Sequence, residues 1–309
     1  MTVTTALAAQ NMPPHEPAAR RALIDIGVGA LLIGAAPVLV RFSDSAPAAS
    51  AFWRLALAAP FALLPVLAGS GAPIRRHGAA TTTVWCLALL TGVFFATDLL
   101  LFHTAIGMTS VANSTVIVNA APVLLPLLVW LLDRRRPGLA AMAALMLASG
   151  GVLVLAWEKL DGVTAAITGD LLAVGAGGAY AVYLWLVRRV RAVLSAGAVM
   201  AAGNAVGALC LGAAVLVEGV PFQPASWSGA AAILGLVLLG QVLGQGLIAR
   251  GLGAAPADAA SALLLLPPVA TAALAWIALG ETLSLLQAGG ALMVLLAVFM
   301  AARRPSGHI

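Results

Sequence analysis

The chain has 309 residues, of which 62% are hydrophobic and only 9% are charged, and its mean hydropathy is +1.06. Soluble domains contain about 25% charged residues, so this composition argues against a soluble enzyme, a disordered chain or a disulfide scaffold. The net charge of +5 does not indicate a nucleic-acid partner, because the basic residues form short clusters between apolar runs. A polytopic helical membrane protein is the class that remains.

Continuous apolar stretches predict ten membrane-spanning helices. Backbone polar groups inside lipid need internal hydrogen bonds, so each stretch is expected to be an α-helix and the protein to be all-α. In chain order, the expected spans cover residues 22–40, 46–68, 82–103, 110–132, 138–157, 168–187, 197–217, 228–249, 257–279 and 283–302.

The distribution of basic residues predicts how these spans are oriented. The N-terminal tail and every second loop carry thirteen of the sixteen basic residues, whereas the opposite loops carry Arg41 and Lys159. Basic loops stay on the cytoplasmic side of a membrane, so both termini are expected to be cytoplasmic. We expect a multi-pass protein of the cytoplasmic (inner) membrane of a bacterium.

The sequence also contains an internal repeat. At an offset of 146 residues, Pro122 falls on Pro268 and Trp130 falls on Trp276. Five spans per half is an odd number, so the two halves are expected to have opposite orientations. Inverted repeats of this kind are typical of secondary transporters, which bind their substrate near the bilayer midplane. The expected segments are a cytoplasmic tail at 1–21, a first repeat at 22–157, an outer linker at 158–167, a second repeat at 168–302 and a cytoplasmic tail at 303–309.

Prolines interrupt the corresponding span of each repeat. Pro122 and Pro126 lie in the fourth span, and Pro267 and Pro268 lie in the ninth. Interruptions at matching positions in both halves point to the binding site of a transporter. We expect these four prolines to act as helix breaks or gates, although single prolines are also common in membrane helices.

Three further features add to the spans and the repeat: Arg54 in the second span, Gly280-Glu281, and the run Thr109-Ser110-Val111-Ala112-Asn113 leading to Ala121-Pro122. With these features the chain resembles the drug/metabolite transporter superfamily, and within it the EamA-domain exporters. The resemblance covers residues 22–302 and implies a secondary transporter that exports amino acids or other metabolites, or that moves drugs. The first repeat departs from the family pattern, because it has Asp133-Arg134-Arg135 where many relatives carry a Gly-Glu pair.

Few ionisable side chains lie inside the expected spans, and such residues usually mark function. Arg54, Asp98, His103 and Asn113 are all expected in the outer half of the bilayer, with Asn119 deeper. Arg54 and Asp98 either bind the carboxylate and ammonium groups of a zwitterionic substrate or form a fixed ion pair between two spans. His103 is either a proton-linked group or a hydrogen-bonded residue at a helix interface.

The second repeat offers further polar candidates. Gln241 and Gln245 are four residues apart, so they share a helix face, and Asn204 lies in the seventh span. These residues either contact substrate or hydrogen-bond only to neighbouring helices. Tyr180 is a candidate aromatic contact for a substrate, whereas Tyr183 is expected in the aromatic belt at the inner interface.

A secondary active transporter that works by alternating access is the leading hypothesis, with amino acids or similar small metabolites as its exported substrate. The sequence contains no phosphate-binding loop of the ATPase type and no metal-ligand spacing, so no cofactor and no metal are expected. The expected partners are a small-molecule substrate and the lipid bilayer, with proton coupling as an option. The alternatives are an intramembrane enzyme that uses Asp98 and His103, and a membrane sensor that does not transport.

Overall fold

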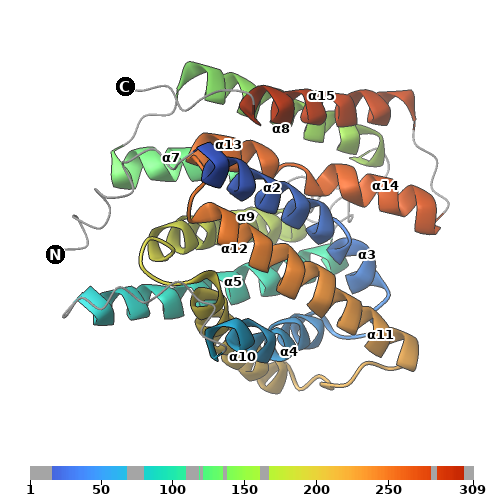
Figure 1. The fold of residues 1–309 in the computed structure, drawn as a ribbon. Coiled ribbons are helices and arrows are strands. Elements are labelled where there is room, and N and C mark those ends of the chain that lie inside the picture. The colour runs from blue at the N-terminus through green and yellow to red at the C-terminus, as the bar shows by residue number, and fades with distance from the viewer. Residues whose placement is uncertain are drawn as a thin grey trace.

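The structure is a computed structural model, and it describes residues 16–67, 80–108, 118, 121–134, 138–160, 167–279 and 284–302. In this part of the chain every regular element is a helix, as Figure 1 shows. Alanine and leucine, which dominate these segments, are strong helix formers. The all-α class expected from the composition is confirmed.

The first half of the chain forms six helices among the described residues. Their sequences are mostly apolar around the whole helix, as expected for helices that face other helices on one side and lipid on the other. They are α2 (Glu16–Ile33), α3 (Ala36–Arg41), α4 (Pro47–Leu67), α5 (Ala80–Met108), α7 (Ala121–Asp133) and α8 (Leu139–Leu160).

The second half repeats this succession. One stretch of it, from Trp227 to Leu252, is a single long helix whose middle part is π-helical, so that its turns hold more residues than an α-helix does. The helices are α9 (Ile167–Val190), α10 (Ala196–Glu218), α11 (Trp227–Gly235), η1 (Leu236–Gln245), α12 (Gly246–Leu252), α13 (Ala257–Leu263), α14 (Pro267–Leu279) and α15 (Leu285–Ala302).

Two of the expected spans are broken into shorter helices. The first divides between α2 and α3, where α3 carries Pro37 in its first turn. The ninth divides between α13 and α14, and α14 begins at Pro267. Proline has no backbone N–H and clashes with the carbonyl four residues earlier, so a regular helix ends ahead of it, whereas the first turn of the next helix accepts it.

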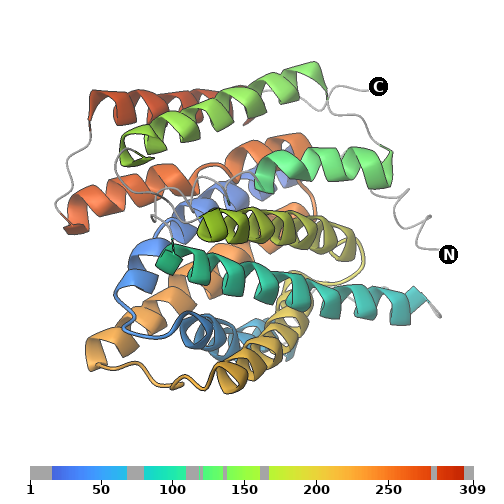
Figure 2. The same ribbon diagram turned by 180° about the vertical axis from the view of Figure 1, so that it is seen from behind.

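Several helices of the two halves of the chain correspond to each other. At the offset of 146 residues, α7 (121–133) coincides with α14 (267–279), and α8 and α15 begin together. The packing corresponds as well, because α5 packs on α9 as the η1–α12 stretch packs on α2. The α4–α10 pair and the α8–α15 pair lie at opposite edges of the bundle in Figures 1 and 2.

Six helical stretches of the described chain are long and apolar enough to cross a membrane, which makes this a multi-pass membrane protein. Shorter apolar stretches of the described chain lie at Met142–Gly151, Ala259–Leu274 and Ala288–Ala297, and the number of ten spans stays a prediction. The six stretches are Pro17–Arg41, Pro47–Leu67, Thr82–Met108, Leu171–Val190, Ala196–Glu218 and Trp227–Leu252.

Glycines let helices of the two halves approach each other closely. A Cβ atom on Gly92 of α5 would lie 2.3 Å from the carbonyl oxygen of Gly203 on α10, which is far inside van der Waals contact. Likewise, a Cβ atom on Gly29 of α2 would lie 2.6 Å from the carbonyl oxygen of Gly244 on η1. Small residues at such crossings are typical of helix packing in membranes, and these two crossings place polar side chains of both halves next to one another.

Candidate functional site

A buried arginine lies between the two halves of the bundle. Arg54 is seven residues from the start of α4, which corresponds to about 10 Å along the helix, and only 4% of it is exposed. Its Nε atom donates a hydrogen bond to Oε1 of Gln241 at 3.0 Å. Its guanidinium carbon also lies 5.6 Å from the ring centroid of Phe95, within the range of a cation–π contact. Both of these partners are neutral.

Gln241 connects this arginine to a third helix. It belongs to the π-helical segment η1 and is fully buried. Its Nε2 atom donates to Oδ1 of Asn204 on α10 at 2.8 Å. Arg54, Gln241 and Asn204 therefore form a continuous polar chain across α4, η1 and α10.

The rings of Tyr183 and Tyr180 extend the cluster beyond Phe95. The ring of Phe95 on α5 stacks on that of Tyr183 on α9 at a centroid distance of 4.5 Å, and Tyr180 stacks on Tyr183 at 5.7 Å. The hydroxyl group of Tyr183 donates to Oε1 of Gln245 at 3.4 Å, and Nε2 of Gln245 donates to the hydroxyl oxygen of Tyr180 at 3.3 Å. The amide of Gln245 thus holds both tyrosine hydroxyls.

Asp98 lies next to this cluster with one oxygen unpaired. It follows Phe95 by three residues on α5, is 5% exposed, and its charge interacts electrostatically with that of Arg54. Its Oδ1 atom is buried and accepts no hydrogen bond from any residue that the structure describes. Leaving a buried acceptor unsatisfied costs about 1–3 kcal/mol, and more for a charged group. The carboxylate is therefore available to a cation or a proton.

His103 lies five residues further along α5 and contacts the start of α4. Its Nδ1 atom is 3.0 Å from Oγ of Ser50 and 3.2 Å from the carbonyl oxygen of Pro47. Its Nε2 atom is buried and has no hydrogen-bond partner among the described residues. His103 is therefore hydrogen-bonded at the α4–α5 interface.

The structure brings six of the candidate residues from the sequence into one connected cluster. Together with Phe95 and Tyr183, we call these residues the Arg54 cluster. Asn113 and Asn119 lie outside the described residues. Pro122 and Pro126 belong to α7, but their side chains are also outside the described part, whereas Pro267 and Pro268 begin α14. The six candidates are Arg54, Asp98, Tyr180, Asn204, Gln241 and Gln245.

Two members of the cluster do not follow from the sequence interpretation. Tyr183, which was expected in the aromatic belt at the inner interface, is buried inside the bundle, since it is only 3% exposed and hydrogen-bonds to Gln245. Its spacing of three residues from Tyr180 puts both on one helix face, which is the signal that identifies it. Phe95 is one of many apolar residues in α5, and no pattern distinguishes it from the others.

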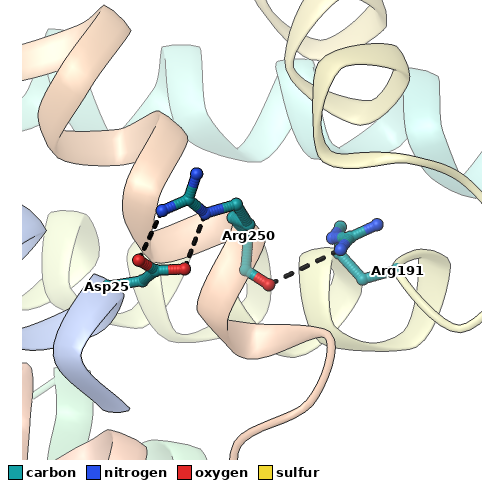
Figure 3. Close-up of polar contacts among 3 residues, drawn as sticks. All are labelled: Asp25, Arg191 and Arg250. Atoms are coloured by element: carbon teal, nitrogen blue, oxygen red, sulfur yellow. Dashed lines mark hydrogen bonds and ion pairs between the residues drawn. The ribbon is translucent and has the colours of Figure 1, made fainter. Parts of the chain in front are cut away.

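A second polar group lies at one end of the bundle, and we call its residues Asp25, Arg191 and Arg250 the clasp (Figure 3). Arg250 on α12 donates through Nε to Oδ2 of Asp25 on α2 at 2.6 Å and through Nη2 to Oδ1 at 2.5 Å. Arg191, in the loop after α9, donates through Nε to the carbonyl oxygen of Ala249 at 2.8 Å and through Nη2 to that of Arg250 at 3.5 Å.

These carbonyl groups belong to the last turn of α12, where a helix leaves its carbonyls without helical partners and carries partial negative charge. Arg191 therefore caps the helix as well as joining it to the loop. Burial lowers the pKa of Arg191 from its ordinary value. The clasp connects α2, α12 and the α9–α10 loop, which belong to both halves of the chain.

The opposite end of the bundle is bridged as well. Oγ of Ser226 donates to Oδ2 of Asp44 at 2.7 Å, and the backbone N–H of Ala225 donates to the carbonyl oxygen of Asp44 at 3.2 Å. Nε1 of Trp53 donates to the carbonyl oxygen of Phe222 at 2.6 Å. Polar contacts between the two halves thus lie on both sides of the Arg54 cluster.

Fold and site together define a multi-pass helical membrane protein whose two similar halves enclose a buried polar cluster. Residues 22–157 and 167–303 each match the model of the EamA-like transporter family. The chain belongs to this family, and so to the drug/metabolite transporter superfamily that its motifs resemble.

Two relatives extend this comparison. The chain is 29% identical to the uncharacterized transporter YwfM of Bacillus subtilis (strain 168) over 217 residues, which cover 68% of this chain and 71% of YwfM. It is also similar to a protein of known crystal structure, with a TM-score of 0.73 and 19% identity, over 89% of this chain and 94% of that chain. The second likeness concerns the fold alone.

Proposed function

We propose that this EamA-family protein is a secondary active transporter that exports amino acids or similar small metabolites across the cytoplasmic membrane of a bacterium. In this proposal the repeats are inverted units of five spans each, and both termini are cytoplasmic. The two repeats exchange conformations, so that the site between them opens alternately to each side. The prolines at the start of α14, and their counterparts at the start of α7, provide the breaks at which these helices move.

The observation that carries this proposal is the unpaired Oδ1 atom of Asp98 beside Arg54. Arg54 donates to a neutral amide, and Asp98 has a free buried acceptor, so each charged group offers a place to a ligand of opposite charge. A zwitterion fits both, with its carboxylate on Arg54 and its ammonium group on Asp98. Uncompensated charge inside a membrane is costly, which supports a functional role for the pair.

Proton coupling follows from the same carboxylate. When no ammonium group is bound, a proton is the other way to neutralise Asp98 inside the bilayer. A proton and a substrate ammonium group then compete for one site, which is the exchange that a proton-driven exporter needs. His103 lies on the same helix, and its Nε2 atom has no hydrogen-bond partner among the described residues, so it is a candidate for a proton relay.

Counterflow in vesicles that contain only this protein tests the proposal, with each of the twenty labelled L-amino acids as probe. We expect saturable flux for at least one of them, loss of that flux in Arg54→Ala, and retention in Arg41→Ala. Arg41 is the matched control, because it is an exposed arginine at the end of α3.

Three other results would overturn the proposal. Flux that Arg54→Ala leaves unchanged would remove Arg54 from the site. Chemical conversion of a probe without flux would indicate an intramembrane enzyme, and binding without flux or conversion would indicate a sensor.

A further inference from the structure

We infer that the side-chain carbonyl of Gln241 occupies, in the ligand-free protein, the place on Arg54 that a substrate carboxylate takes. Gln241 is then a specificity-determining residue, because a ligand must displace it to reach the guanidinium group. The inference rests on the proposed function, since it takes Arg54 to be the group that binds the substrate carboxylate.

The orientation of the Gln241 amide follows from its two partners. Arginine has only donor groups, so Gln241 must present its oxygen to Nε of Arg54, at 3.0 Å. Its amide nitrogen then donates to Oδ1 of Asn204, at 2.8 Å. Asn204 thereby fixes the carbonyl of Gln241 in the direction of Arg54.

This arrangement satisfies a buried cation without neutralising it. A lone guanidinium group inside the bundle would be costly, and a neutral amide oxygen reduces that cost when no ligand is present. A carboxylate forms shorter hydrogen bonds to arginine, which are roughly twice as strong and often bidentate. A substrate carboxylate therefore outcompetes the amide oxygen, whereas an uncharged carbonyl group does not.

A glycine precedes Gln241 beside the guanidinium group. A Cβ atom on Gly240 would lie 3.7 Å from the guanidinium carbon of Arg54 and 3.4 Å from Cδ1 of Leu236, both ordinary contact distances. The glycine therefore adds no side-chain atom to the packed surroundings of Arg54. The segment is also π-helical, and π-helical turns are frequently found at functional sites.

Asp98 differs from Arg54, because a ligand does not have to displace a side chain from its Oδ1 atom. No side chain of the described chain donates to its Oδ1 atom, so an amine reaches Asp98 without displacing a neighbour. The cluster therefore distinguishes ligands by the carboxylate: an amino acid must displace Gln241, and the amine that lacks the carboxylate leaves Gln241 in place.

The test measures thermal unfolding of the purified full-length protein in detergent. The probes are the twenty L-amino acids, each compared with the amine formed by its decarboxylation. In Gln241→Glu, the new carboxylate pairs permanently with Arg54. We therefore expect the best amino acid to bind about 100-fold more weakly, and its amine to bind at least as tightly as to the wild type.

Gln241→Leu removes the competing carbonyl and is expected to change affinity in the other direction. The amino acid should bind about tenfold more tightly, because it no longer has to replace a hydrogen bond to a charged group. The matched control is Gln245→Leu, which changes the same helix face one turn later, where the amide contacts tyrosines and not the arginine. This variant should show no gain that depends on the carboxylate.

The following results would contradict the inference. If Gln241→Glu binds amino acids as the wild type does, while Arg54→Ala does not bind them, the inference is wrong and the proposed function stands. If no amino acid stabilises the wild type, or if Arg54→Ala binds like the wild type, both fall. If Gln241→Glu does not fold, unchanged or weaker amino-acid binding by Gln241→Leu overturns the inference.

Discussion

Two arginines join the halves of this protein in different ways. Arg250 in the clasp has a side chain that is 60% exposed, and it pairs with a carboxylate through two hydrogen bonds. Arg54 is 4% exposed and donates to an amide, although the carboxylate of Asp98 is near enough to interact with it electrostatically. The exposed arginine hydrogen-bonds to a carboxylate, whereas the hydrogen bond from Nε of the buried one goes to a neutral amide.

The difference separates a structural contact from a candidate binding group. A carboxylate and a guanidinium group at the surface satisfy each other, and such a pair contributes about 0–1 kcal/mol. In our proposal, the guanidinium group of Arg54 inside the bundle, with a neutral amide as its hydrogen-bond partner, leaves its charge to a ligand. Four experiments would sharpen this distinction or break it.

The largest effect is expected from lysine substitutions at the two arginines. Lysine is a point charge that does not reproduce the planar, bidentate geometry of arginine. We expect Arg54→Lys to reduce counterflow of the best amino acid about 100-fold, because the ammonium group cannot hold both a carboxylate and the rest of the cluster. Arg250→Lys should stay within about twofold, because a surface cation still pairs with Asp25. Equal losses in both variants would show that the two arginines do not differ in role.

The second-largest effect is expected from alanine substitutions at two glycines, Gly92 at the α5–α10 crossing and Gly253 beside Arg191 of the clasp. Alanine at Gly92 would place its Cβ atom 2.3 Å from a backbone oxygen of Gly203, so α5 and α10 would have to separate. Alanine at Gly253 would meet the flexible end of Arg191 at 2.8 Å, which can move aside. We expect Gly92→Ala to lower the free energy of unfolding by about 1–3 kcal/mol and Gly253→Ala by less than about 0.5 kcal/mol.

Chemical unfolding in detergent measures both changes. Gly178→Ala on α9 is the control, because a Cβ atom there meets no other atom within 4 Å, and alanine favours the helix by about 1 kcal/mol. A Gly92→Ala protein as stable as the wild type would mean that the α5–α10 crossing is not close-packed.

The third prediction concerns the two aspartates. Asp98→Asn keeps the shape of the side chain but removes its charge and its exchangeable proton. We expect the flux to fall about tenfold, as for the loss of one charge-assisted hydrogen bond, and to lose its dependence on an imposed pH gradient. Asp25→Asn should retain that dependence, because Asp25 belongs to the clasp. Wild-type rate and pH dependence in Asp98→Asn would contradict the coupling proposal.

The smallest effect is expected from reversing the clasp. Asp25→Arg and Arg250→Asp should each lower the thermal stability slightly, and the double exchange should restore it. The coupling energy of the cycle should be about 0.2–1 kcal/mol and should shrink at high salt, which screens exposed charges. A coupling energy of zero at low salt would mean that the ion pair in Figure 3 contributes nothing to stability.

Composition and periodicity were enough to predict the helical membrane class and the repeat, because both depend on properties spread over the whole chain. Arg54 and Asp98 were also predictable, since ionisable residues inside apolar spans are few. The partner of Arg54 was not predictable. Gln241 is 187 residues away, and spacing along the sequence does not show which polar residue of another helix faces a given side chain.

Local rules failed where packing decides the outcome. Tyr183 is near the end of its span, which suggests an interfacial position, yet the approach of α5 buries it against Phe95. The helix breaks before Pro37 and Pro267 follow from the chemistry of proline. The π-helical turns of η1, which packs against α2 and α4, follow from no residue type in the sequence.

Because of these π-helical turns, the number of residues in this helix, as well as their types, determines where Gln241 and Gln245 point. Each residue of an α-helix turns the chain by about 100°, so deleting one residue between Leu236 and Gly240 would rotate the two glutamines relative to α11. Such a deletion would keep every polar side chain of the site and would misdirect two of them. Alignments that treat a gap in this stretch as neutral would therefore group proteins with different binding sites.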